Sequence, residues 1–291
     1  MSDVRVLITG GGGQLASDLA AQLKQRAQVH APSRAELDIT DDGAVEAVFV
    51  GLRPTLVINC AAFHNVEVCE REEDRAFEVN ARAVKRLSAR SDELGARFVH
   101  LSTNYVFDGS ASAPYDEAAT PSPRSIYAIS KLAGEHAALA YAPDALVVRT
   151  AGLYGLHGSA SKGGNFVTRM IERARQQGAL NVVADQLLTP TFTADLAAAI
   201  VASVDVGVTG TVHLTNSGTT SWHGFTEAIM ELAGVPVAVA PTRTVRAPGA
   251  ADRPLNGVLT SSVAGPPPLR PWKDALADYL ERAGLLAVAP A

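Results

Sequence analysis

Short apolar runs alternate with amphipathic stretches of helical length throughout the first half of the chain. The runs predict buried strands over residues 4–9, 28–31, 56–60, 97–102 and 145–150. The stretches between them predict helices over residues 15–24, 42–51, 72–94 and 127–141. This alternation requires crossover connections, which pair strands in parallel and cover both faces of the sheet with helices. We therefore expect an α/β fold with a doubly wound, Rossmann-type parallel sheet over residues 1–150.

The pattern changes after residue 150, where glycine- and proline-rich loops appear. Helices are predicted over residues 165–177, 193–204, 221–233 and 271–283, with short strands at 180–183 and 211–214. Residues 151–291 thus predict a smaller mixed α/β part that binds a ligand at the carboxyl ends of the sheet strands. The boundary at 150 is soft, because we expect some later segments to return to the main sheet.

Composition narrows the class of protein. Of the 291 residues, 47% are hydrophobic and 19% are charged, which is typical of a folded globular chain. Nowhere does an apolar run reach the roughly 18 residues of a membrane span, and a net charge of −5 disfavours a nucleic-acid surface. Two cysteines and seven histidines show neither a disulfide framework nor metal-ligand spacing. We expect a cytoplasmic protein with no metal site, no nucleic-acid partner and no membrane partner.

The first predicted strand ends in a glycine-rich turn. Gly10, Gly13 and Ala16 follow the spacing G-x-x-G-x-x-A and lead into a predicted helix. Small residues allow a tight turn and bring backbone N–H groups close to a pyrophosphate, and the helix N-terminus favours its negative charge. Because the turn opens a βαβ series, it predicts a dinucleotide-binding site.

The end of the second predicted strand bears on the choice of dinucleotide. A carboxylate at this point binds the ribose hydroxyls of NAD, whereas a hydroxyl and an arginine suit the 2′-phosphate of NADP. The chain has Ser33 and Arg34 here, and the first acid is Glu36. This favours NADPH and leaves NADH open as an alternative.

Three further residues predict a reductase. Thr103 directly follows the strand predicted at residues 97–102, and Tyr127 and Lys131 lie four apart on one face of the following helix. A phenol is a poor acid at its ordinary pKa, so we expect the nearby ammonium to lower the pKa of Tyr127. Thr103 would polarise a carbonyl group while Tyr127 donates the proton and the cofactor supplies the hydride.

Together these motifs resemble the short-chain dehydrogenase/reductase superfamily. Over nearly its whole length the chain is similar to the dTDP-4-dehydrorhamnose reductase family. The matching segments include GGGGQLA at 10–16, INCAAFHNVEVCE at 58–70, STNYVFDG at 102–109, YAISKLAGE at 127–135, DQLLTPTFTADLA at 185–197 and DRP at 252–254.

The resemblance implies a role for each matched residue. It gives Thr103, Tyr127 and Lys131 as the catalytic set, with Tyr127 and Lys131 also contacting the cofactor. Other cofactor contacts are implied for Gly10, Gly13, Gln14, Leu15, Asp38, Ile39, Ala61, Ala62, Phe63 and Asn80. The sugar is expected beside Val66, Thr103, Asn104 and Tyr127.

Nucleotide recognition has further candidates in the second half. Arg169, Arg173 and Arg175 lie within two predicted helical turns and are candidates for the diphosphate, although a solvated helix face explains such a group equally well. Trp222 follows a helix-start signal and is a candidate for the nucleotide base.

Three positions depart from the family's usual pattern. Asn104 stands where the family has aspartate, Gly152 where a tryptophan is frequent, and Gly257 where a serine is usual. The implied reaction is NADPH-dependent reduction of the C4 ketone of a nucleotide-linked 4-keto-6-deoxy sugar, first of all dTDP-4-dehydro-L-rhamnose to dTDP-L-rhamnose. There are two alternatives. The chain reduces a different keto-sugar nucleotide, or it is a non-catalytic NADP-binding subunit similar to the regulatory subunit of methionine adenosyltransferase. A homodimer is compatible with the resemblance.

Overall fold

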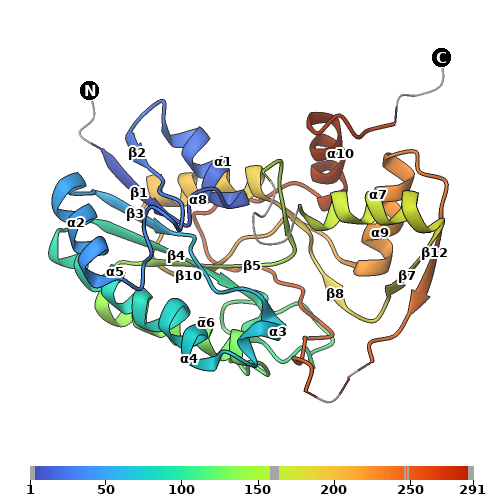
Figure 1. Cartoon of the computed structure of the whole chain (residues 1–291), viewed down its shortest axis with the longest axis horizontal. Coiled ribbons are helices and arrows are strands. Elements are labelled where there is room, and N and C mark those ends of the chain that lie inside the picture. The colour runs from blue at the N-terminus through green and yellow to red at the C-terminus, as the bar shows by residue number, and fades with distance from the viewer. Residues whose placement is uncertain (1–3, 158–163, 246, 248, 288–291) are drawn as a thin grey trace.

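A large parallel sheet forms the centre of the fold in the computed structural model, which describes residues 4–157, 164–245, 247 and 249–287 (Figure 1). Neighbouring strands pair in the order β2-β1-β3-β4-β5-β10. Their bounds are β1 (Arg5–Thr9), β2 (Gln28–His30), β3 (Leu56–Asn59), β4 (Arg97–Thr103), β5 (Leu146–Thr150) and β10 (Gly210–His213). The predicted doubly wound parallel sheet is confirmed, with each strand end within one residue of its expected position.

Helices cover both faces of this sheet, because consecutive strand residues point to opposite sides. On β1, Val6 and Ile8 pack with α1 and α8, whereas Leu7 packs with α2, α5 and α6 on the other face. The covering helices are α1 (Gln14–Leu23), α2 (Asp42–Leu52), α5 (Ala83–Glu93), α6 (Ile126–Tyr141) and α8 (Thr193–Asp205). Burial on both faces explains why β1 and β3 are almost continuous apolar runs.

The helix expected over residues 72–94 is interrupted by a change of helix type. The structure has α4 (Glu73–Phe77), a π-helical turn η1 (Glu78–Arg82) and then α5. Turns of this kind often occur at functional sites, and this one contains the fully buried Asn80. The Asn80 carboxamide accepts a hydrogen bond from the Phe63 N–H at 2.8 Å and donates one to the Ser130 hydroxyl at 3.0 Å. The π-helical turn therefore ties the loop after β3 to α6.

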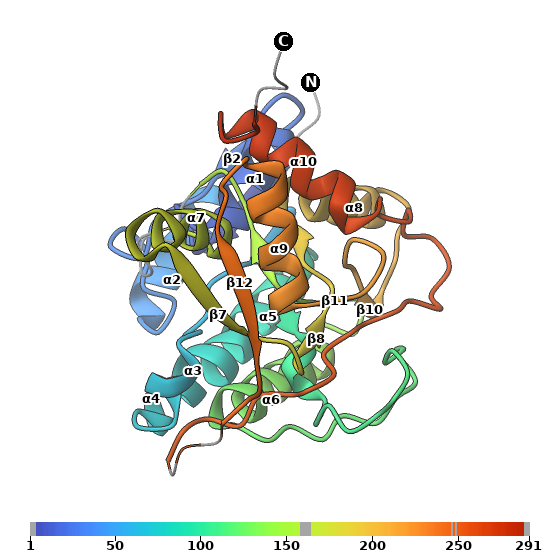
Figure 2. The same ribbon diagram turned by 90° about the vertical axis from the view of Figure 1, so that its right-hand side faces the viewer.

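A smaller part with its own core lies beside the sheet (Figure 2). It contains the parallel pair β7 (Ala179–Val183) and β12 (Ala238–Thr242), with α7 (Phe166–Gln177), α9 (Trp222–Leu232) and α10 (Trp272–Arg282). The fully buried Tyr154 lies at the centre of this core, with ring centroids 5.3 to 5.7 Å from those of Phe192, Phe225 and Tyr279. Large aromatic rings bury much apolar area per residue, which lets a small part maintain a separate core.

The chain passes between the two parts several times. α8 and β10 follow residue 150 in sequence, yet α8 packs on α1 and β10 pairs with β5. Two short strand pairs also form, β6 (Leu153–Tyr154) with β9 (Thr191–Phe192), and β8 (Leu187–Leu188) with β11 (Thr220–Ser221). Residues 251–259, here called the strap, run back to the first part, where Leu259 bridges to Tyr115. Among the described residues, no helix combines the length and apolarity that crossing a membrane requires.

Candidate active site

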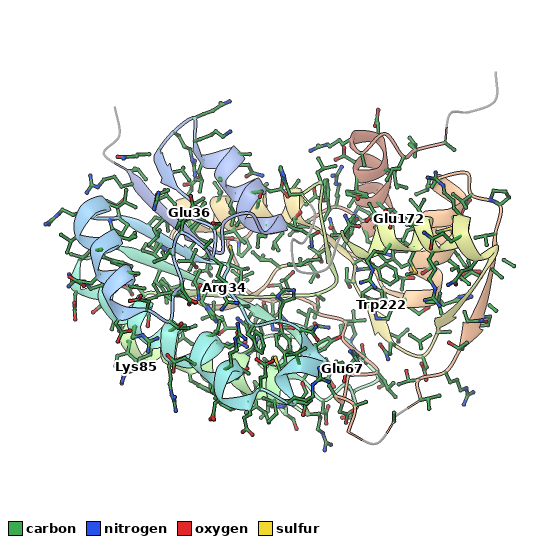
Figure 3. All side chains as sticks on the ribbon, in the orientation of Figure 1. Arg34, Glu36, Glu67, Lys85, Glu172 and Trp222 are labelled. Atoms are coloured by element: carbon green, nitrogen blue, oxygen red, sulfur yellow. The ribbon has the colours of Figure 1, made fainter. Side chains whose placement is uncertain are left out.

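Both parts of the chain line one cavity of about 460 Å³. The sheet contributes the turn after β1 and the end of β4, while the second part contributes the start of α7, residue Trp222 and the strap. Figure 3 shows Arg34 and Trp222 on the two parts that face each other across this region. Open parallel sheets bind ligands at the carboxyl ends of their strands where the strand order reverses, and this sheet reverses between β1 and β3.

The turn after β1 fits a dinucleotide diphosphate. Gly10 has a φ of +74°, and a β-carbon on it would lie 2.8 Å from the backbone nitrogen of Ala61, so only glycine is accommodated. Gly13 caps α1 without a side-chain acceptor, which leaves the first N–H groups of the helix for an anion. The buried Oε1 atom of Gln14 finds no hydrogen-bond partner among the described residues. Together with Leu15, these residues of the turn line the cavity.

The loop after β2 lies against this turn, because Gly11 and Ser33 form a backbone bridge. The bridge places Ser33 and Arg34 beside the glycine turn. Arg34 is exposed and its guanidinium lies 3.4 Å from the Asp38 carboxylate. The carboxylate of Glu36 accepts a hydrogen bond from the Ser33 N–H at 2.7 Å, so the nearest acid is held by the backbone of its own loop.

The other predicted cofactor residues occupy different positions around the cavity. Ala62 lines it directly, and Ala61 adjoins the glycine turn. Phe63 is held at both its N–H and its carbonyl by the Asn80 carboxamide. Ile39 is buried in the core on the α2 face of the sheet. The structure therefore brings Ala61 next to the glycine turn and Ala62 into the cavity lining, while Asn80 supports the Phe63 loop and Ile39 lies in the core.

Thr103 and Tyr127 meet at the edge of the cavity. Thr103 ends β4, and α6 begins just before Tyr127, where the Ser125 hydroxyl caps the helix by accepting from the Ala128 N–H. The Thr103 and Tyr127 side chains both line the cavity, and the Thr103 hydroxyl accepts a hydrogen bond from the Tyr105 N–H at 3.2 Å. The sequence predicted both residues for one site, and the fold places both at the same cavity.

The pKa of Tyr127 differs from the sequence expectation. Burial raises the pKa of the Tyr127 phenol, and the hydrogen bond with Thr103 only partly offsets this. The expected lowering by Lys131 is wrong for this state of the protein, because the ammonium nitrogen of Lys131 turns to β4, 2.6 Å from the Leu101 carbonyl oxygen and 3.3 Å from Nε2 of His100. The phenol is protonated near neutral pH at its ordinary pKa as well, and the raised pKa makes it a weaker acid.

A buried ionic network lies beneath these residues. Burial lowers the pKa of Lys131 to about 8, opposed by the negative charge of Glu135. The Glu135 carboxylate pairs with the Arg149 guanidinium at 2.6 Å and also accepts from the Ser102 hydroxyl. Sequence reasoning missed Glu135 and Arg149. The four-residue spacing from Tyr127 through Lys131 to Glu135 was the available signal, because it places all three on one helix face.

The second part contributes an aromatic and basic wall to the cavity. Phe166 and Trp222 both line it, with ring centroids 4.5 Å apart. Arg169 lines it as well. Arg173, by contrast, is engaged with Gln177 further along the helix. Of the predicted nucleotide contacts, Trp222 and Arg169 therefore face the ligand space.

Comparison with known proteins identifies the family. The model of the RmlD substrate binding domain matches residues 4–284. The chain belongs to this family. It is 40% identical over 286 residues to a dTDP-4-dehydrorhamnose reductase of Mycobacterium tuberculosis, covering 95% of this chain and 92% of that protein. It is also 40% identical to a dTDP-4-keto-6-deoxy-D-glucose reductase of Streptomyces niveus, covering 94% of this chain and 95% of that protein.

A solved structure confirms the family's fold for this chain. The dTDP-4-dehydrorhamnose reductase of Bacillus anthracis in complex with NADP has a TM-score of 0.90 and 34% identity, with 97% of this chain and 100% of that chain covered. The resemblance to dTDP-4-dehydrorhamnose reductases inferred from the motifs is confirmed.

The three departures from the usual pattern of the RmlD family lie in the same cavity. Asn104, Gly152 and Gly257 all line it. The Asn104 side chain donates a hydrogen bond to the Gly257 carbonyl oxygen at 2.9 Å. Two departures that are far apart in sequence are therefore in direct contact at the site.

Proposed function

We propose that this chain reduces the C4 ketone of a nucleotide-linked 4-keto-6-deoxy sugar with NADPH, with Thr103, Tyr127 and Lys131 as its catalytic set. The observation that carries the proposal is that Thr103, Tyr127 and Lys131 line the same cavity as the glycine turn. Relatives matched over almost their full length are named as reductases of such sugars.

The chemistry divides between the cofactor and the side chains. When bound, NADPH supplies a hydride to the carbonyl carbon, which breaks the π bond of the ketone and leaves negative charge on its oxygen. Thr103 donates a hydrogen bond to that oxygen, and Tyr127, whose phenol is protonated near neutral pH, delivers the proton that completes the alcohol. A lysine ammonium has three donors. Leu101 takes one of those of Lys131, and we assign another to a ribose hydroxyl of the nicotinamide half.

The cofactor preference rests on the loop after β2. Ser33 and Arg34 lie beside the glycine turn, where a hydroxyl and a guanidinium bind a 2′-phosphate. A relative with 34% identity was crystallised with NADP. We propose NADPH as the preferred donor.

The remaining walls of the cavity support a nucleotide-linked sugar as substrate. Val66 and Thr103 border the sugar, Arg169 meets the diphosphate, and the paired rings of Phe166 and Trp222 stack with the base. Relatives named for two different 4-keto sugars are both 40% identical to this chain, so overall similarity does not select the sugar. We propose dTDP-4-dehydro-L-rhamnose as the substrate and dTDP-L-rhamnose as the product.

The decisive experiment is a turnover assay with purified protein. NADPH oxidation would be followed with dTDP-4-dehydro-L-rhamnose and, separately, with dTDP-4-keto-6-deoxy-D-glucose, and NADH would be run in parallel. We expect turnover with NADPH and formation of the corresponding alcohol. Binding of NADPH without turnover of either sugar would contradict these substrates. It would favour first a different keto-sugar nucleotide, and second a binding subunit similar to the regulatory subunit of methionine adenosyltransferase.

A further inference from the structure

A chain of buried polar side chains crosses three strands of the sheet and ends at Lys131. The Thr9 hydroxyl on β1 donates to Oδ1 of Asn59 on β3 at 2.6 Å. Nδ2 of Asn59 lies 3.1 Å from Nδ1 of His100 on β4, and Nε2 of His100 lies 3.3 Å from Nζ of Lys131. All four residues are at most 2% exposed. Because these groups are removed from water, each hydrogen bond constrains the next one.

The distances indicate the orientation of the Asn59 carboxamide. A separation of 2.6 Å is typical of an O–H···O hydrogen bond and short for an N–H···O one, so the carboxamide oxygen faces Thr9. The amide nitrogen then faces His100 and, having only donors, makes Nδ1 of the ring an acceptor. Burial keeps the pKa of His100 well below its usual value, so the ring is neutral. Its single proton is therefore on Nε2, the nitrogen that faces Lys131.

A second buried histidine has the opposite arrangement. Burial lowers the pKa of His213 as well, and Nδ1 of this ring lies 2.9 Å from the Thr260 carbonyl oxygen and 3.1 Å from that of Tyr115. A carbonyl only accepts, so the proton of His213 is on Nδ1. Nε2 is then an acceptor, and it faces the Arg149 guanidinium at 3.5 Å. A ring beside a permanent cation needs this tautomer, whereas His100 directs an N–H at its lysine.

The other groups around Lys131 distinguish less between its two protonation states. The Leu101 carbonyl oxygen, at 2.6 Å, accepts from an ammonium and from an amine alike. The charge of Glu135 on the same helix favours the ammonium, but this carboxylate is already part of a buried ion pair. Burial raises the pKa of Cys60, on the loop after β3, to about 12, so the thiol is uncharged near neutral pH. The His100 N–H is therefore the contact that separates amine from ammonium.

We propose that His100 favours the neutral amine form of Lys131, because Asn59 occupies the acceptor nitrogen of the imidazole and leaves its N–H directed at the lysine. The amine accepts this N–H with its lone pair, donates one hydrogen to Leu101 and keeps the other for the cavity that Lys131 lines. An ammonium has no lone pair and would face the N–H without a hydrogen bond. Burial, the first cause of the lowered pKa of Lys131, acts in the same direction.

His100 is thus a positioning residue that acts through Lys131. It is itself fully buried. The protonation of Lys131 follows from the contacts in the core, and only its importance for turnover rests on the proposed function.

The first test determines which ring nitrogen of His100 carries the proton. In protein labelled with ¹⁵N at histidine, the NMR chemical shifts of the two ring nitrogens distinguish the tautomers, and the His100 signals are assigned through the stacked ring of Phe98. We expect the Nε2–H tautomer at pH 7 and at pH 9. His213 is the internal control and should show the Nδ1–H tautomer. An Nδ1–H tautomer of His100 at either pH would overturn the proposal, because the ring would then accept from an ammonium.

The second test compares the pH dependence of stability with and without the imidazole. His100→Gln supplies a carboxamide that rotates its oxygen toward Lys131 and accepts from the ammonium. In each background, urea unfolding is compared with that of the same protein carrying Lys131→Met, at pH 8 and pH 10.5. The stabilisation that Lys131 contributes between these pH values should be about tenfold smaller in the unfolding constant, because the pKa of Lys131 rises by about one unit. An unchanged contribution would overturn the proposal.

His213→Gln is the matched control, because it replaces the other buried imidazole. We expect the contribution of Lys131 to the pH dependence to stay as in the parent protein. An equal decrease in both glutamine variants would show that loss of any buried imidazole has this effect, and the proposal would be wrong. The tautomer measurement uses the parent protein, so it decides the question even if His100→Gln does not fold.

Neither measurement uses a substrate, which keeps this inference distinct from the proposed function. If neither 4-keto sugar were turned over while His100 showed the Nε2–H tautomer, the function would fail and the inference would stand. Turnover together with an Nδ1–H tautomer would support the function and refute the inference.

Discussion

The ammonium nitrogen of Lys131 lies 2.6 Å from the carbonyl oxygen of Leu101, two residues before Thr103 on β4. This buried contact joins α6 to the catalytic strand. Tyr127 lies one helical turn before Lys131 on the same face. The contact therefore also fixes the position of the phenol relative to Thr103. The geometry of the proposed catalytic pair is therefore fixed by the core of the protein, and the long loop between β4 and α6 does not have to define it.

Removing the phenolic hydroxyl should abolish most of the activity. Tyr127→Phe deletes the proposed proton donor, and we expect kcat to fall about 10²- to 10⁴-fold. NADPH affinity, measured by fluorescence titration, should change little, because the glycine turn is untouched. Tyr141→Phe on the exposed end of the same helix is the control and should leave kcat unaltered. Loss of cofactor binding in Tyr127→Phe would show that the assigned role is wrong.

The buried ammonium of Lys131 should make folding stability depend on pH. Its pKa is lowered from 10.5 to about 8, first of all by burial. Between these two values the unfolded chain holds a proton that the folded protein has released, so stability rises with pH in this window. Urea unfolding should show that the free energy of unfolding of the parent protein, relative to that of Lys131→Met, rises by up to about 3 kcal/mol from pH 8 to pH 10.5. If the difference in free energy of unfolding between the two proteins were the same at both pH values, the prediction would be wrong.

Removing the guanidinium after β2 should change cofactor preference. Arg34→Ala removes the proposed partner of the 2′-phosphate, so the dissociation constant for NADPH should rise about tenfold and that for NADH should stay constant. Arg282→Ala is a matched control, because Arg282 pairs with Asp278 four residues away as Arg34 pairs with Asp38. Equal weakening of both cofactors by Arg34→Ala would argue against 2′-phosphate recognition.

Alanine substitutions at two glycines of the same turn distinguish the effect of backbone strain from the effect of a steric collision. Gly10 and Gly12 have φ values of +74° and +80°, so alanine at either position costs about 1–2 kcal/mol of strain. A β-carbon on Gly10 also collides with Ala61, whereas on Gly12 it meets no described atom within 4 Å. We expect Gly10→Ala to lower stability and NADPH affinity much more than Gly12→Ala, as measured by unfolding and by titration. Similar losses in the two variants would refute the steric argument.

Local sequence patterns predicted much of the first part of the fold. The apolar runs of β1 and β3 are buried on both faces, and that burial is what makes them recognisable without a structure. The glycine turn was predictable for a similar reason, because its spacing reflects a local backbone requirement. Periodicity did not reveal the π-helical turn around Asn80, since its apolar pattern differs little from that of a regular helix.

By itself, the sequence determined the parallel sheet, the glycine turn and the membership of Thr103, Tyr127 and Lys131 in one site, because these depend on local spacing or on motif resemblance. Tertiary structure alone decided which way Lys131 points, that Glu135 pairs with Arg149, and that Asn104 meets Gly257. Each of these contacts joins segments that no local periodicity connects. Their partners are chosen by burial, since a polar group removed from water must find whichever donor or acceptor the packed core brings to it.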